Sequence, residues 1–182
     1  MKGTGSGSDA HLIEVRLRNI NALFNSMDPS PFHEKDLDAA AEDFIVGWAL
    51  KFPLGDRVAL QVQLEEWPGD ESATSIPAAV RHHFAYRTEL IGREFSQLMR
   101  QARGSLAIGL SFLALCLLTS HYLLGDMEQA WAKILRESLS IAGWVAMWRP
   151  MELYLYDWWP LRHRRKLYEK LSRMQVDVVR RN

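Results

Sequence analysis

Three charged residues interrupt a stretch of the chain that is otherwise apolar and aromatic. Arg149, Glu152 and Asp157 lie within residues 138–160, among several tryptophans and tyrosines. If this stretch is a helix in a bilayer, a charge near its middle costs about 2.5–3.5 kcal/mol and requires a partner. Glu152 follows Arg149 by three positions, on the same helix face, which favours an ion pair. We therefore predict a polar contact within the membrane at these residues, with Asp157 near the surface, where an arginine can pair with it.

The contact between Arg149 and Glu152 has three interpretations. The pair can be self-contained, with the Arg149 side chain reaching the head groups. It can instead bind a partner subunit. It can also line a path for ions or protons, because Pro150 frees a backbone carbonyl and can kink the helix. Two helices from one chain cannot enclose a pore, so the last interpretation requires an oligomer.

Residues 105–124 form the plainest apolar stretch, with no Asp, Glu, Lys or Arg. At about 1.5 Å per residue, a helix of this length crosses the hydrocarbon core of a bilayer, which is about 30 Å thick. With residues 138–160 as a second span, the sequence predicts a transmembrane helical hairpin. Small residues that let helices approach closely recur in both spans, which favours packing within the hairpin or, alternatively, a homodimer. They are Ala107, Ser111, Ala142, Gly143 and Ala146.

Basic residues flank both predicted spans on the same side. Arg100 and Arg103 precede the first span, residues 162–166 after the second are strongly basic, and the loop 125–137 contains only Lys133 and Arg136. Lysine and arginine near span ends mark the cytoplasmic side of a membrane. We therefore expect a multi-pass protein of the bacterial plasma (inner) membrane with both termini in the cytoplasm.

The first part of the chain has the pattern of a small α/β domain. Apolar residues alternate along residues 11–18 and 57–64, which is the period of a half-buried strand. Between them, apolar residues recur at helical spacing, and Asp36 or Asp38 can cap that helix. The apolar positions of the helix are Leu37, Ala41, Phe44, Trp48 and Phe52. Strand, helix and strand in this order favour two parallel strands, and alternation near the end of the chain, over residues 174–178, predicts a third.

A second helix is predicted to lead into the first span. Residues 66–75 have the composition of a polar loop, and Pro77 suits the first position of a helix that continues without a break into residues 105–124. Apolar side chains recur along one face of this helix, and Arg87 is the one charged member of that face. The apolar members are Val80, Phe84, Ile91, Phe95 and Leu98.

The predicted fold class is an α+β membrane protein, in which a two-span hairpin carries a small cytoplasmic α/β domain. The predicted segments are a flexible tail (1–10), the cytoplasmic domain (11–75), a juxtamembrane helix (76–104), the first transmembrane helix (105–124), an external loop (125–137), the second transmembrane helix (138–160) and a basic cytoplasmic tail with the candidate third strand (161–182).

The sequence contains none of the common motifs for catalysis or cofactor binding. The phosphate-binding G-x-x-x-x-G-K-[ST], G-x-G-x-x-G, H-E-x-x-H and C-x-x-C patterns do not occur. His82 and His83 are adjacent and point about 100° apart on a helix, so they do not share a metal site. The acidic residues among 28–43 are interpreted as a helix cap and a solvated face. We therefore expect no catalytic residue, no cofactor, no metal and no enzymatic activity.

Charge is unevenly distributed along a chain whose formal net charge is zero. The acidic stretch 28–43 contrasts with the basic stretch 162–181, which suits anionic lipid head groups. The aromatic residues are needed at the membrane surface, so nucleic acid is not an expected partner. We expect a non-enzymatic scaffold, anchor or accessory subunit that binds another membrane protein or a second copy of itself. The alternative is an oligomeric channel or transporter component that uses the Arg149–Glu152 pair.

Overall fold

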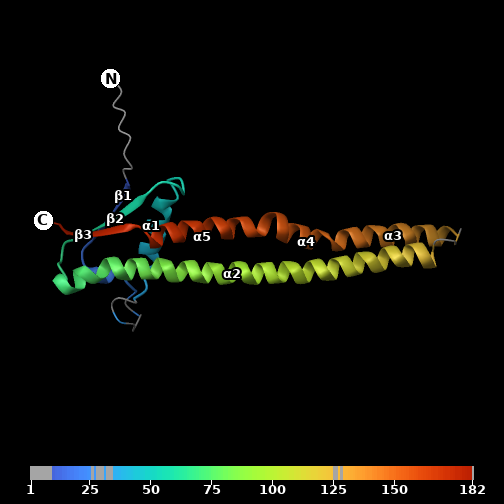
Figure 1. Cartoon of the computed structure of the whole chain (residues 1–182), viewed down its shortest axis with the longest axis horizontal. Helices are drawn as coiled ribbons and strands as arrows, with labels where there is room; N and C mark the ends of the chain where they lie inside the picture. The colour runs from blue at the N-terminus through green and yellow to red at the C-terminus, as the bar shows by residue number, and fades with distance from the viewer. Residues whose placement is uncertain are drawn as a thin grey trace, which may run out of the picture. The chain divides into compact units, whose positions relative to one another are not determined.

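The computed structural model describes residues 10–25, 27, 31, 35–124, 127 and 129–181 (Figure 1). Most of the predicted tail 1–10 therefore lies outside the described residues, as do Asp28 and Glu34 of the acidic stretch and residues 125, 126 and 128 of the predicted loop. The chain divides into two compact units. We call Met1–Ile91 with Arg164–Asn182 the sheet unit, and Gly92–His163 the helical unit.

A three-stranded parallel sheet organises the sheet unit. The strands β1 (His11–Leu17), β2 (Val58–Leu64) and β3 (Gln175–Arg180) lie side by side in that order (Figure 1). In the register, Ile13 pairs with Leu60 and Leu60 pairs with Val176, and both strand pairs are parallel. The predicted parallel pair and the predicted third strand are therefore confirmed.

One face of the sheet carries the core. Ile13, Leu60 and Val176 are buried, whereas Glu14 and Asp177, which alternate with them along β1 and β3, are exposed. Side chains from three helices complete this core, and they include Ile45, Phe84, Val80, Leu167 and Leu171. Burial of these large aliphatic and aromatic side chains contributes most of the free energy that stabilises the packing of the helices on the sheet.

Helix α1 (Ala39–Ala49) connects β1 to β2 and begins where the sequence predicts. The Asp38 carboxylate accepts a hydrogen bond from the Ala40 amide at 2.9 Å, and so it caps the first turn. The buried face of α1 agrees with the predicted one only in part. Ala41 and Ile45 are buried as predicted, whereas Phe44 and Trp48 are exposed and Glu42 is buried.

Helix α2 (Asp70–Leu118) begins earlier than the sequence suggests, because Asp70 to Ser75 is helical rather than loop. Gly69 has a φ of +94°, a conformation that glycine adopts easily, and it turns the chain into the helix. The Trp67 indole donates to the Asp70 carboxylate at 3.0 Å, which fixes this first turn. The helix then runs through residues 105–118 and ends in the π-helical turn η3 (Thr119–Leu123). This agrees with the predicted helix that continues without a break into residues 105–124.

The rest of the helical unit is a series of shorter helices. α3 (Ala130–Ala146) is followed by α4 (Trp148–Glu152), the π-helical turn η4 (Leu153–Asp157) and α5 (Trp158–Ser172), which continues into the sheet unit. The predicted second span, residues 138–160, therefore falls on parts of four elements.

One helix in the described part of the chain, Ser72–Leu123, is long and apolar enough to cross a membrane. This criterion uses length and composition alone, and a core helix of a soluble protein can also meet it. This helix is therefore weak evidence for membrane association. The second predicted span, residues 138–160, stays a prediction.

Candidate functional site

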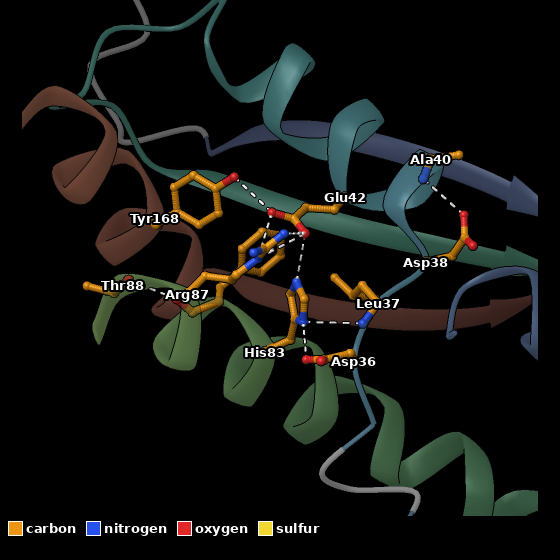
Figure 2. Close-up of polar contacts among 10 residues, drawn as sticks. Asp36, Leu37, Asp38, Ala40, Glu42, His83, Arg87, Thr88 and Tyr168 are labelled. Atoms are coloured by element: carbon orange, nitrogen blue, oxygen red, sulfur yellow. Dashed lines mark hydrogen bonds and ion pairs between the residues drawn. The ribbon is translucent and has the colours of Figure 1, made fainter. Parts of the chain in front are cut away.

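A buried carboxylate lies at the centre of a connected group of polar side chains in the sheet unit. We call Asp36, Glu42, His83, Arg87 and Tyr168 the Glu42 cluster (Figure 2). Arg87 donates to the Glu42 carboxylate through Nη2 at 2.7 Å and through Nε at 3.1 Å and 3.2 Å. The Tyr168 hydroxyl donates to Oε1 at 2.8 Å, and His83 Nε2 lies 3.2 Å from Oε2.

Three helices bring these side chains together. Glu42 lies in the first turn of α1, His83 and Arg87 are one helical turn apart on α2, and Tyr168 comes from α5. Figure 2 shows all three partner side chains pointing toward the Glu42 carboxylate. The rings of Phe84 and Tyr168 pack with centroids 5.9 Å apart, which supports the position of the hydroxyl.

The electrostatics of the cluster favour an ionised Glu42. Burial by itself would raise the pKa of Glu42, but hydrogen bonds from His83, Arg87 and Tyr168, with the Arg87 charge, lower it from 4.5 to about 2. The hydrogen bond to Glu42 raises the pKa of Arg87. Burial, followed by the hydrogen bond to the Glu42 carboxylate, raises the pKa of Tyr168. The cluster therefore contains a carboxylate anion, an arginine cation and a neutral phenol at neutral pH.

The second ring nitrogen of His83 faces the segment that leads into α1. His83 Nδ1 lies 3.2 Å from the Leu37 backbone nitrogen and 2.9 Å from Asp36 Oδ1 (Figure 2). His83 is almost fully buried, with 3% of its side chain exposed, whereas 51% of the Asp36 side chain is exposed. His83 thus connects the start of α1 to the buried carboxylate.

The contacts of Glu42 connect side chains of α1, α2 and α5. Both Glu42 oxygens accept hydrogen bonds from donors at 2.7–3.2 Å. Within the described ranges, no group of three or more His, Cys, Asp or Glu residues is placed to hold a metal ion. A buried carboxylate that is paired with arginine and hydrogen-bonded on both oxygens holds its neighbours in one geometry, and removing a partner is costly.

The residues predicted at the membrane contact lie on α4 and η4. Arg149 Nη1 donates to Glu152 Oε2 at 2.8 Å, so these two residues are brought together as a pair. Their side chains are 57% and 45% exposed. Asp157 lies at the end of η4, and in the described part of the chain it makes no hydrogen bond or ion pair with either of them.

Two of the predicted small residues lie between α2 and α3. A Cβ atom on Gly143 would come within 2.8 Å of Leu113 Cδ1, and one on Gly109 would lie 3.2 Å from the Ala146 carbonyl oxygen. Gly143 and Ala146 therefore lie at a close approach of the two helices, together with Gly109, which the sequence prediction did not include. The other three predicted residues, Ala107, Ser111 and Ala142, are exposed.

Sequence reasoning did not find the Glu42 cluster. One signal was available, since Arg87 is a lone charge on an apolar helix face and such a charge needs a buried partner. The identity of the partner has no local signal, because Glu42 and Arg87 are 45 residues apart in the sequence, and Glu42 and Tyr168 are 126 apart.

Comparison with protein-family models, with curated proteins and with solved structures found no match for this chain.

Proposed function

We propose that this protein is a non-enzymatic membrane anchor or scaffold, in which a two-span helical hairpin carries the sheet unit as an accessory subunit of a membrane complex. The observation that carries this proposal is the pairing of β3 with β2 in one sheet. β2 precedes α2 in the sequence and β3 follows α5. If α2 crosses a membrane, the chain must cross back before β3 can pair with β2. The same sheet therefore supports residues 138–160 as a second span.

The exposure of apolar side chains in the helical unit supports a lipid environment. In the most apolar 18-residue window of the candidate span, only 11% is buried, whereas the core helix of a soluble protein is mostly buried. Large apolar side chains are also exposed along α3 and α4. The exposed side chains of the two regions include Ile108, Leu115, Leu118, Ile141, Trp144, Val145 and Trp148. Large exposed apolar surface mostly marks a membrane or protein interface, so these side chains support the proposal.

The charges fit the same architecture. The basic residues of α5 would face anionic head groups on the cytoplasmic side, and each contributes about 1 kcal/mol near such a surface. Arg149 and Glu152 satisfy each other at 2.8 Å, which favours a self-contained pair over a contact with a partner. On this proposal the membrane is the bacterial inner membrane, and both ends of the chain lie in the cytoplasm.

The alternative, a channel or transporter component, has one observation in its favour. Arg149 and Glu152 lie on either side of Pro150 in α4, directly before the π-helical turn η4, and π-helical turns are frequent at functional sites. Ion flux through liposomes that contain the purified protein tests this alternative. Flux that Arg149→Leu and Glu152→Gln leave unchanged would remove it.

Reporter fusions test the two-span topology. A reporter at Gln129 should behave as external, and reporters before β1 and after β3 should behave as cytoplasmic, with the protein resistant to alkaline extraction. Release of the protein into the soluble fraction by alkaline extraction would contradict the membrane proposal. An external reporter after β3 would end the two-span topology, because β2 and β3 would then lie on opposite sides.

Native purification in mild detergent tests the scaffold role. Membrane proteins that co-purify in constant proportion with this chain at its natural expression level would support an accessory subunit. Recovery of the chain alone at every expression level would count against it.

A further inference from the structure

One nitrogen atom in the Glu42 cluster has two neighbours that require opposite protonation states. The Leu37 backbone N–H donates to His83 Nδ1 at 3.2 Å, which requires a lone pair on that nitrogen. Asp36 Oδ1 lies 2.9 Å from the same nitrogen, a distance typical of a charge-assisted hydrogen bond from a protonated ring to a carboxylate. A single ring nitrogen presents either a lone pair or a proton in this direction, so it can satisfy only one neighbour at a time.

The other ring nitrogen is the same in both states. His83 Nε2 faces Glu42 Oε2 at 3.2 Å, and Glu42 is ionised, so Nε2 carries a proton and donates to it. Neutral His83 is then the tautomer with a free lone pair on Nδ1, and it accepts from Leu37. When the ring takes up a second proton from water, Nδ1–H donates to Asp36 instead, and the Leu37 amide loses its acceptor.

We propose that His83 is a protonation switch that exchanges Leu37 for Asp36 as the partner of Nδ1 and thereby changes the start of α1. Histidine is the side chain that ordinarily changes charge near neutral pH. The carboxylate and the ring differ in exposure: 51% of the Asp36 side chain is exposed to solvent, whereas only 3% of the His83 side chain is exposed.

Among the described residues, the charged groups around the ring come from three helices and the segment before α1. Asp36 lies in the segment before α1 and Glu42 lies on α1. Arg87 on α2 and Tyr168 on α5 both bind the Glu42 carboxylate, and Arg164 on α5 acts on Tyr168 through its charge. Arg87 pairs with Glu42, and the Asp36 carboxylate is the acid that faces His83 Nδ1.

The switch acts on a short paired segment. Leu37 forms an isolated antiparallel bridge with Phe24, the Asn25 amide donates to the Asp36 carbonyl at 2.9 Å, and the Asp38 amide donates to the Leu23 carbonyl at 2.9 Å. Asp38 is also the residue that caps α1. A change at Leu37 therefore reaches both the pairing with residues 23–25 and the first turn of α1.

Nitrogen-15 NMR of the full chain in detergent or nanodiscs tests the switch. At alkaline pH the His83 ring should be the neutral tautomer protonated on Nε2, and the Leu37 amide should be protected from hydrogen exchange. On acidification both ring nitrogens should become protonated, and Leu37 amide exchange should accelerate with the same midpoint. A ring protonated on Nδ1 at every pH, or a Leu37 amide whose exchange does not follow the protonation of the ring, would overturn the proposal.

Two variants separate the switch from a general acid effect. Asp36→Asn removes the anion that stabilises the protonated state, so it should move the acid transition of the Leu37 amide to lower pH by about one unit. His82→Gln changes the adjacent, exposed histidine and should leave that transition in place. An unshifted transition in Asp36→Asn would overturn the proposed exchange. The switch lies within the sheet unit, so this test and the topology test can fail independently.

Discussion

Glu42 is the residue whose charge contributes most clearly to the stability of the sheet unit. Its pKa is lowered from 4.5 to about 2 in the folded protein, so the folded state binds fewer protons than the unfolded state between these values. The stabilisation is therefore fully present above about pH 4.5 and is lost as the pH falls toward 2. A shift of this size corresponds to about 3 kcal/mol, of which about 2 kcal/mol is lost between pH 7 and pH 3.

Glu42→Gln should remove this pH dependence. The variant leaves Arg87 without its buried anion, so we expect a loss of about 3 kcal/mol at pH 7 and a smaller decline in stability toward pH 3 than in the wild type. Denaturant unfolding at both pH values measures the difference. Asp43→Asn, on the exposed neighbour in α1, should keep the wild-type decline. A decline in Glu42→Gln as steep as in the wild type would contradict the assignment.

Residue-scale prediction from sequence succeeded where the interaction is local. The Asp38 cap and the Arg149–Glu152 pair join residues two and three positions apart, so spacing alone predicts them. It failed for Glu42, because hydrophobic periodicity assigns carboxylates to the solvent face. A carboxylate is buried only when distant donors meet it, and Tyr168 is one of those donors.

At the scale of elements, the close approach of α2 and α3 makes a specific demand on Gly143. A Cβ atom there would lie 2.8 Å from Leu113 Cδ1 and 3.4 Å from Cys116 Cβ. Gly143→Leu should therefore force the two helices apart and cost about 1–3 kcal/mol through overpacking. Thermal unfolding of the purified protein in detergent measures this loss.

Ala142→Leu is the matched control, because Ala142 is the preceding residue on the same helix and is exposed. It should leave thermal unfolding nearly unchanged. If Ala142→Leu lowered the transition and Gly143→Leu did not, α2 and α3 would meet through a different face of α3.

Prediction of the helices and strands from sequence depended on how regularly apolar and polar residues alternate in each segment. The strands were predictable because apolar residues occupy every second position of β1, β2 and β3, and each has one buried face. The start of α2 was not, because Gly69 and the polar residues after it have turn-like composition. There a helix forms because a positive-φ glycine and the Trp67–Asp70 hydrogen bond organise the first turn.

At the scale of the whole molecule, the sheet unit depends on residues from both ends of the described chain. Val176 is buried in β3 and pairs with Leu60, so Val176→Asp should place a charge in the core. We expect the sheet unit to become sensitive to protease, while the proposed hairpin keeps the chain in the membrane fraction. Limited proteolysis of isolated membranes measures both effects.

Gln175→Ser is the control for this variant, since Gln175 is exposed on the same strand. It should remain as resistant to protease as the wild type. Resistance of Val176→Asp equal to that of the wild type would mean that β3 is dispensable for the sheet unit.

The position of β3 also affects the time at which the protein can fold. Arg181, next to β3, donates to Glu65, next to β2, across 116 residues of sequence. A ribosome therefore releases β1, α1 and β2 well before the strand that completes their sheet, and α5 and Tyr168 are also made late. During that interval Glu42 lacks one of its donors and the β2 edge is open, so a nascent chain would be exposed to misassembly until translation passes β3.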